Sequence, residues 1–133
     1  MAALVIDASA TVGALFPDER NVRVDAVLAQ VRDNGGLVPG HWWFEIRNAL
    51  LMAERRGRAS SGETAEFLAS LRDLPISVAL LPDEAAVFTL ARRHRLTFYD
   101  AAYLELAKRE GLALATFDRD LVAAARAERV AVA

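Results

Sequence analysis

Four acidic residues stand where a carboxylate can do chemistry. Asp7 and Asp118 each follow a short apolar run of the kind that forms a buried strand. Asp100 lies in the first turn of a predicted helix, and Glu45 lies within the apolar stripe of another. Because open α/β folds bind their ligands at the carboxyl ends of their strands, these acids are candidates for one shared site.

A cluster of these carboxylates predicts a bound divalent cation. Each close pair repels by up to about 4 kcal/mol at roughly 4 Å and an effective dielectric constant near 20. The chain has no cysteine, and His41 and His94 are not spaced for a zinc site, so an all-oxygen ligand set selects Mg²⁺ or Mn²⁺. Such an ion activates water and stabilises a leaving oxygen, which indicates phosphodiester hydrolysis.

Each acid also has a simpler interpretation. Asp7, Asp100 and Asp118 all precede predicted helices, where an aspartate is favoured as a cap or by the helix dipole. Taken singly, capping is the more common role. Glu45 lies in the middle of a helix, where it would pair with a neighbouring polar side chain or face water if the helix phase is different.

Asp120 is a rival to Asp118 as the fourth acid. The two side chains point in different directions on the last helix, so both cannot face one ion. Because Leu121 and the alanines after it define the buried face, we expect Asp120 on the flank and Asp118 at the site.

The elements that must position these acids alternate between strands and helices. The predicted strands cover residues 3–6, 37–38, 74–81, 112–116 and 130–132, and the predicted helices cover 8–16, 21–33, 41–56, 61–73, 82–94, 97–107 and 119–127. No Asn-Gly hairpin signal separates the strands, which favours a parallel sheet covered by helices on both faces. We therefore expect an α/β fold, a three-layer α/β/α sandwich with a central, mostly parallel sheet.

Composition limits the class of protein. With 133 residues, 54% hydrophobic and 26% charged, residues 1–133 are expected to form a single globular domain. The absence of cysteine fits a reducing cytoplasm, and the first apolar run is too short for a signal peptide or a membrane span. A net charge of −2 means that any polyanion would be held locally, not by the whole surface.

Two arginine clusters and an aromatic cluster are secondary features. Arginines at 55, 56 and 58 and at 92, 93 and 95 fit solvated helix faces, with phosphate contact as the less common alternative. Trp42 and Trp43 are adjacent and cannot both point into one core. We expect one of them, or Phe44 beside them, to lie at a subunit or partner interface, although a single exposed aromatic is equally ordinary.

Four motifs in order resemble one known family. The segments VIDASA, FEIRNAL, FYDAAYLELA and LATFDRDL contain the four acids, and together they resemble the PIN-domain ribonucleases, in particular the VapC toxins of toxin-antitoxin pairs. The resemblance extends over residues 5–121. Each motif is weak alone, but four at this spacing are fairly specific.

The resemblance implies a metal-dependent endoribonuclease. It would make Asp7, Glu45, Asp100 and Asp118 the acidic quartet that binds Mg²⁺ or Mn²⁺, supported by hydrogen bonds from three polar residues, namely Ser9, Asn48 and Thr116. It also implies an RNA substrate, a cognate antitoxin protein over the active-site groove, and a homodimer.

Two other classes stay open at this point. A phospho-receiver signalling domain has a similar size and also uses acids at strand ends, but it requires paired acids after its first strand and a lysine after a late strand. Here Ala8 follows Asp7, and Lys108 lies within a helix. The other class is a PIN-like module that has lost catalysis and only binds a partner.

Overall fold

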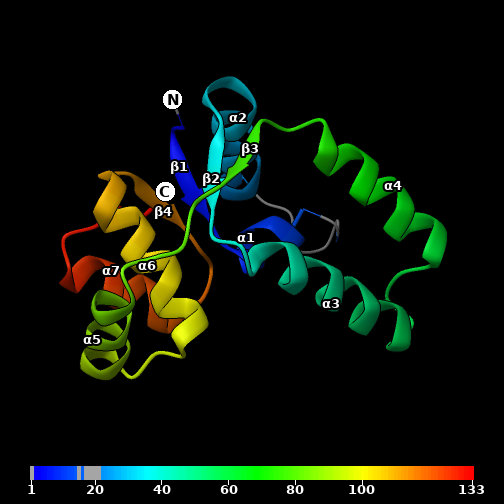
Figure 1. The fold of residues 1–133 in the computed structure, drawn as a ribbon. Helices are drawn as coiled ribbons and strands as arrows, with labels where there is room; N and C mark the ends of the chain where they lie inside the picture. Colours follow the sequence, from blue (N-terminus) through cyan, green and yellow to red (C-terminus); the bar gives the residue numbers. More distant parts are fainter. Residues whose placement is uncertain (1, 15, 17–21) are drawn as a thin grey trace.

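A computed structural model of the chain describes residues 2–14, 16 and 22–133 (Figure 1). The strands are β1 (Leu4–Ile6), β2 (Gly36–Val38), β3 (Ile76–Val78) and β4 (Ala113–Ala115), and the helices are α1 (Ala8–Val12), α2 (Val22–Asn34), α3 (Trp42–Arg55), α4 (Ser61–Arg72), α5 (Glu84–His94), α6 (Phe98–Glu110) and α7 (Arg119–Ala127). Strands and helices alternate along the chain in the order that the sequence predicts.

The four strands form one parallel sheet in the order β3-β2-β1-β4. Val5 in β1 is level with Leu37 in β2 and with Leu114 in β4. All three residues of β1 are buried, because this inner strand has helices over both of its faces. The sheet therefore directs the carboxyl ends of β1, β2 and β4 toward the same edge.

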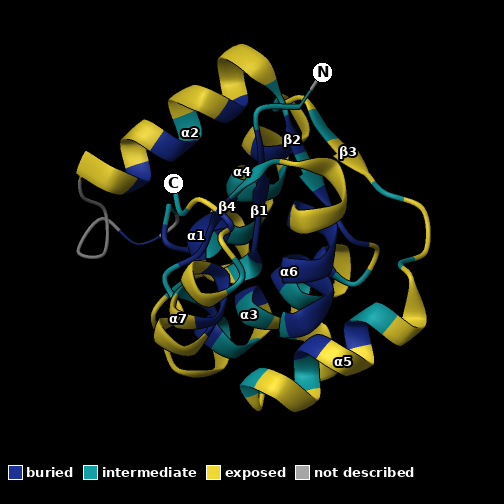
Figure 2. Ribbon diagram, turned by 90° about the vertical axis from the view of Figure 1, so that its left-hand side faces the viewer, coloured by how far each residue is buried: buried dark blue, intermediate teal, exposed yellow. Residues whose placement is uncertain are grey.

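Helices cover the sheet on both sides, as predicted for a three-layer α/β/α fold. In Figure 2, α2 and α7 lie to the left of β1, and α5 and α6 lie to the right. Every residue of α6 from 101 to 107 is buried, since α6 packs between the sheet and α5. This central helix contains Asp100 in its first turn, so the acid is held by the best-packed helix of the fold.

The α3 helix buries the stripe expected from the sequence, with Trp42, Ile46 and Leu50 in the core and Ala49 only half-buried. Together with α4 it extends to the right of the sheet in Figure 1. In α4 only Leu71 is fully buried. No helix among the described residues is long and apolar enough to cross a membrane.

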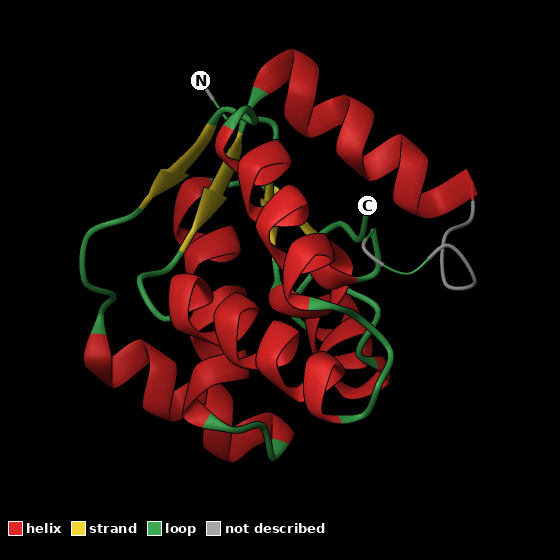
Figure 3. Ribbon diagram, turned by 90° about the vertical axis from the view of Figure 1, so that its right-hand side faces the viewer, coloured by secondary structure: helices red, strands yellow, loops and turns green. Residues whose placement is uncertain are grey.

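Several predicted boundaries are wrong. The predicted strand 74–81 is only Ile76–Val78, and Figure 3 shows a long loop leading from this edge strand to α5. The predicted strand 130–132 is a single bridge between Leu114 and Val132. The first helix ends at Val12, not at residue 16, and the predicted start of the second helix at residue 21 lies outside the described residues.

Candidate functional site

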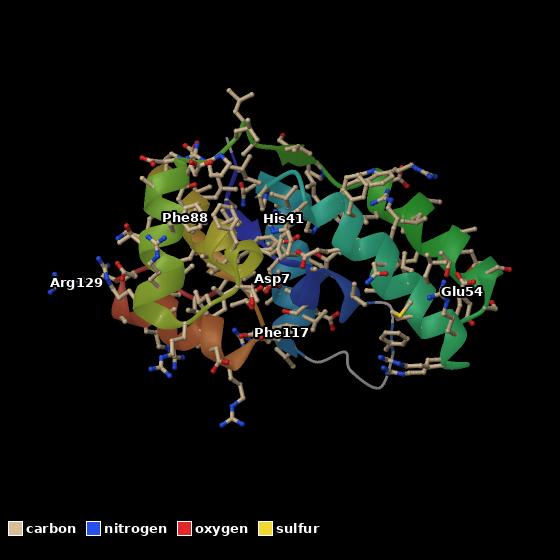
Figure 4. The ribbon with its side chains drawn as sticks, turned by 60° about the horizontal axis from the view of Figure 1, so that its bottom comes forward. Asp7, His41, Glu54, Phe88, Phe117 and Arg129 are labelled. Carbon is tan, nitrogen blue, oxygen red and sulfur yellow. The ribbon has the colours of Figure 1, made fainter. Side chains whose placement is uncertain are left out.

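The carboxyl ends of β1 and β4 bring Asp7 and Thr116 together. Ile6 is level with Ala115, and the Asp7 amide donates to the Ala115 carbonyl at 3.0 Å. One residue further on, the Thr116 hydroxyl donates to Oδ2 of Asp7. Both side chains are buried, with Asp7 only 4% exposed. Figure 4, which brings this edge of the sheet forward, shows Asp7 near the middle of the molecule, between His41 and Phe117.

Asp7 is at once a helix cap and a member of the site. Its Oδ1 accepts from the Ala10 amide at 2.9 Å, which makes it the N-cap of α1, and also from the Ser9 hydroxyl at 2.8 Å. The Ser9 hydroxyl in turn accepts from the Phe117 amide at 3.1 Å. Ser9 and Thr116 therefore hold the Asp7 carboxylate in one orientation.

Burial raises the pKa of Asp7, and the charge of Asp100 raises it further. The hydrogen bonds from Thr116, Ala10 and Ser9 oppose this shift, because they stabilise the ionised carboxylate. The rise comes chiefly from burial of the carboxylate, with the charge of Asp100 as a smaller cause. A carboxyl group in this setting favours a metal ion or a proton.

Asp100 is the acid that links the others electrostatically. Its capping interpretation is wrong, because Thr97 is the N-cap of α6 and accepts from the Asp100 amide at 3.0 Å. The pKa of Asp100 is raised first by burial, then by the charges of Asp118 and Glu45. The charge of Asp100 also raises the pKa of Asp7. Asp100 therefore interacts electrostatically with all three other acids of the predicted quartet.

Glu45 is compensated by partners that the sequence reasoning missed. The Tyr103 hydroxyl donates to its Oε1 at 2.6 Å, and His41 Nε2 lies 3.6 Å from the same oxygen. Two spacings could have indicated these partners: Tyr103 is three residues after Asp100 on one face of α6, and His41 is four residues before Glu45.

Asp118 lies at the same edge but is more exposed than Asp7. Its Oδ1 caps α7 by accepting from the Leu121 amide at 2.9 Å, and its own amide donates to Thr116 Oγ1 at 3.0 Å. Asp120 is exposed in the first turn of α7. The charges that raise the pKa of Asp100 are those of Asp118 and Glu45, which favours Asp118 over Asp120 as the fourth acid.

Asn48 does not support the acids as the family resemblance implies, and Arg23 is a neighbour of the site that the sequence did not indicate. Asn48 is exposed on α3, one turn beyond Glu45, and within the described part of the chain it has no hydrogen bond to the four acids. Arg23 of α2, which the sequence did not single out, donates to the Thr116 carbonyl at 3.1 Å and stacks 4.9 Å from the Phe117 ring centre. A cation therefore lies beside the acidic edge.

The donor set fits a hydrated hard cation better than a closed cage. Among the described residues, no three His, Asp or Glu side chains converge closely enough to hold one metal ion directly. Mg²⁺ commonly keeps several waters and is bound through one or two carboxylates, and Asp7 and Asp100, with their raised pKa values, are the best placed for this role. Glu45 and Asp118 would then act through the ion's water shell.

Comparisons with known proteins find matches over most of the chain. The sequence matches the profile of the PIN domain family over residues 4–127. It is 34% identical over 123 residues to Ribonuclease VapC3 of Pyrobaculum aerophilum, covering 89% of this chain and 91% of the relative. It is 33% identical over 121 residues to Ribonuclease VapC3 of Mycobacterium tuberculosis, covering 91% of this chain and 86% of the relative. A crystal structure of a Pyrobaculum aerophilum protein superposes with a TM-score of 0.73 at 28% identity, over 92% of this chain and 84% of that one.

Proposed function

This chain belongs to the PIN domain family, and from that premise we propose that it is a metal-dependent endoribonuclease that hydrolyses RNA phosphodiester bonds. The observation that carries the proposal is the position of Asp100 at the edge where Asp7 lies: the pKa of Asp100 is raised by burial and then by the charges of Asp118 and Glu45, and Asp100 in turn raises the pKa of Asp7. Family membership argues against the phospho-receiver alternative.

The surroundings of each residue of the site indicate its proposed role. Asp7 and Asp100 would hold Mg²⁺ or Mn²⁺ directly, while Glu45 and Asp118 would orient water molecules of its shell. Such an ion, when bound, lowers the pKa of water and stabilises negative charge on a phosphate oxygen. Ser9 and Thr116 keep the Asp7 carboxylate oriented. Arg23 provides the local cation that a phosphate backbone requires on a chain of net charge −2.

The biological setting follows from the relatives. Their shared name, Ribonuclease VapC3, supports the proposal that this chain is the toxin of a type II toxin-antitoxin pair. We propose accordingly that it acts in the cytoplasm, that residues 1–133 form one domain, and that it forms a homodimer inhibited by a cognate antitoxin.

The direct test is cleavage of RNA by the purified chain with Mg²⁺ or Mn²⁺, with the new RNA ends identified by sequencing. Asp7→Asn keeps the size of the side chain and one oxygen that can cap α1, but it removes the charge and replaces one acceptor oxygen by an NH2 group, so we expect at least a ~100-fold loss of cleavage. The circular dichroism spectrum should not change. If the wild-type chain leaves RNA intact under these conditions, the catalytically silent binding module is the better assignment.

A matched pair of variants tests the fourth acid. We expect Asp118→Asn to need more Mn²⁺ for half-maximal cleavage and to lower kcat by ~10-fold or more, whereas Asp120→Asn changes either value less than twofold. Both variants remove one aspartate charge from the start of α7, so the helix-dipole effect is shared. A larger loss for Asp120→Asn would assign the role to Asp120.

A further inference from the structure

Tyr103 is a buried polar residue whose hydroxyl serves the candidate site. Its side chain lies in the middle of α6 and is only 1% exposed. A hydroxyl buried to this extent requires a hydrogen-bond partner, and its partner is Oε1 of Glu45 at 2.6 Å. The contact joins α6, which contains Asp100, to α3, which contains Glu45.

The same ring also fixes His41. The His41 ring packs edge-on against Tyr103, with ring centres 4.8 Å apart and an interplanar angle of 67°. Its Nε2 lies 3.0 Å from the Tyr99 carbonyl and 3.6 Å from Glu45 Oε1. Tyr103 therefore holds Glu45 through its hydroxyl and holds the next neighbour of Glu45 through its ring.

Without this hydrogen bond, the Glu45 side chain is free to turn away from the other acids. It is half-exposed on α3, and a glutamate side chain has enough rotatable bonds to turn toward solvent and away from the other acids. Repulsion from Asp100, whose pKa Glu45 raises, favours that movement when no cation is bound. The hydrogen bond that the Tyr103 hydroxyl donates to Oε1 at 2.6 Å opposes that movement.

We propose that Tyr103 is a positioning residue, which fixes the Glu45 carboxylate beside Asp100 so that Glu45 can take part in binding the divalent cation. The inference rests on the proposed function, because it assigns Tyr103 a role at that same site. It predicts that the hydroxyl matters only as long as Glu45 is a carboxylate.

The test compares Tyr103→Phe with Tyr99→Phe. Each removes one hydroxyl and keeps the ring, but the Tyr99 side chain is 60% exposed and its carbonyl, which contacts His41, is unchanged. Mn²⁺ binding is measured by calorimetry without RNA, and RNA cleavage gives kcat and KM separately. We expect Tyr103→Phe to weaken Mn²⁺ binding and to lower kcat, each by ~10-fold, with KM unchanged. Tyr99→Phe should match wild type.

A double-mutant cycle separates positioning from a general structural role. Once Glu45→Gln has removed the carboxylate, adding Tyr103→Phe should cause no further loss of Mn²⁺ binding, because the hydroxyl acts through Glu45. Independent losses that add in the double mutant would overturn the inference, as would a Tyr103→Phe protein that binds Mn²⁺ like wild type. A wild-type chain that neither binds Mn²⁺ nor cuts RNA would instead overturn the proposed function.

Discussion

At the scale of single residues, the site stores unfavourable charge that no described side chain neutralises fully. The pKa of Asp100 is raised by burial and by two neighbouring acids. The pKa of Asp7 is raised by burial and by the charge of Asp100. Strain of this kind is tolerated at functional sites when binding a ligand relieves it. The metal-free protein is therefore expected to be less stable than its packing alone would make it.

Replacing Asp100 by asparagine should stabilise the metal-free protein. The change removes like-charge repulsion and leaves the Thr97 cap intact, because that cap binds the backbone amide of residue 100. In EDTA we expect Asp100→Asn to melt a few degrees higher than wild type, since ~1 kcal/mol corresponds to about 4 °C in a chain of this size. Added Mg²⁺ should raise the wild-type Tm more than that of the variant.

The pH dependence of protein stability is a second test of the repulsion between Asp100 and its neighbouring acids. A carboxyl whose pKa is raised by folding adds stability below its ordinary value of 3.8, and this stability is lost as pH rises through the raised value. The advantage of Asp100→Asn in EDTA should therefore grow as pH increases across that window. Asp120→Asn is the control. An Asp100→Asn protein that melts clearly lower than wild type at neutral pH would contradict the repulsion argument.

The sequence, together with the family resemblance, was sufficient to find the acids and the two residues that support Asp7, but not the partners of Glu45. Asp7 and Asp118 could be placed because the ends of parallel strands share an edge, which is a rule about backbone topology. Tyr103 gives no such signal, because a tyrosine ring packs like an apolar residue while the partner of its hydroxyl comes from another helix. Contacts between side chains on different elements have no local signature.

At the scale of elements, Glu128 joins three helices outside the candidate site. It lies at the C-cap of α7, and its carboxylate accepts from Lys108 of α6 at 2.7 Å and from Arg93 and His94 of α5 at 2.7 and 2.6 Å. The hydrogen bonds from Lys108, His94 and Arg93 lower the pKa of Glu128 to about 2. These contacts connect α5, in which only Val87 and Leu90 are buried, to α6 and to the end of α7.

We expect Glu128→Gln to destabilise the protein by ~2 kcal/mol at pH 7, because Lys108, Arg93 and His94 lose their charged acceptor. The lowered pKa means that the wild-type advantage is present above the ordinary value of 4.5 and is lost as pH falls toward about 2. Urea unfolding at several pH values measures it. Glu110→Gln is the control, since that side chain is 45% exposed in a 3.6 Å pair with Arg109 and should cost little. Equal losses for both variants would contradict the idea.

The order of elements was predictable, whereas strand lengths and one cap were not. Alternation continues through Leu80, but β2 ends at Val38, whose carbonyl accepts the last bond from the Ala79 amide at 2.8 Å, so β3 extends no further. The N-cap of α4 is Ser60, because the Ser60 hydroxyl accepts from the Glu63 amide while the Glu63 side chain accepts from the Ser60 amide. Two adjacent serines offer the same cap chemistry, and only the position of Glu63 distinguishes them.

At the scale of the whole molecule, apolar surface gathers beside β3 and the start of α6. Leu80 and Leu81 are 88% and 93% exposed in the loop after β3. They line a cavity of about 520 Å³ together with Phe44 and Phe98, which are also exposed. A monomeric protein rarely leaves so many large apolar side chains together in water.

The structure favours one of the three adjacent aromatic residues for the predicted interface. Trp42 is buried and its indole nitrogen donates to Thr11 at 3.0 Å. Trp43 is half covered by its own neighbour, because the Arg47 guanidinium stacks 4.0 Å from its ring centre. Phe44 is 70% exposed and borders the cavity that Leu80 and Leu81 line. Of the three, Phe44 is the one that we expect at a subunit or antitoxin interface.

The proposed homodimer should therefore depend on Leu80 and Leu81. Light scattering of the isolated chain at micromolar concentration is expected to give twice the mass of one chain. The double change Leu80→Lys and Leu81→Lys should shift it to the monomer without lowering the Tm of the monomer, since both side chains contribute little to the core and charges at the centre of an apolar interface are costly. Leu51→Lys on α3, 48% exposed and away from the cavity, is the matched control and should leave the dimer intact. A wild-type chain that scatters as a monomer would rule out the dimer, and dissociation by Leu51→Lys instead would move the interface to the outer face of α3.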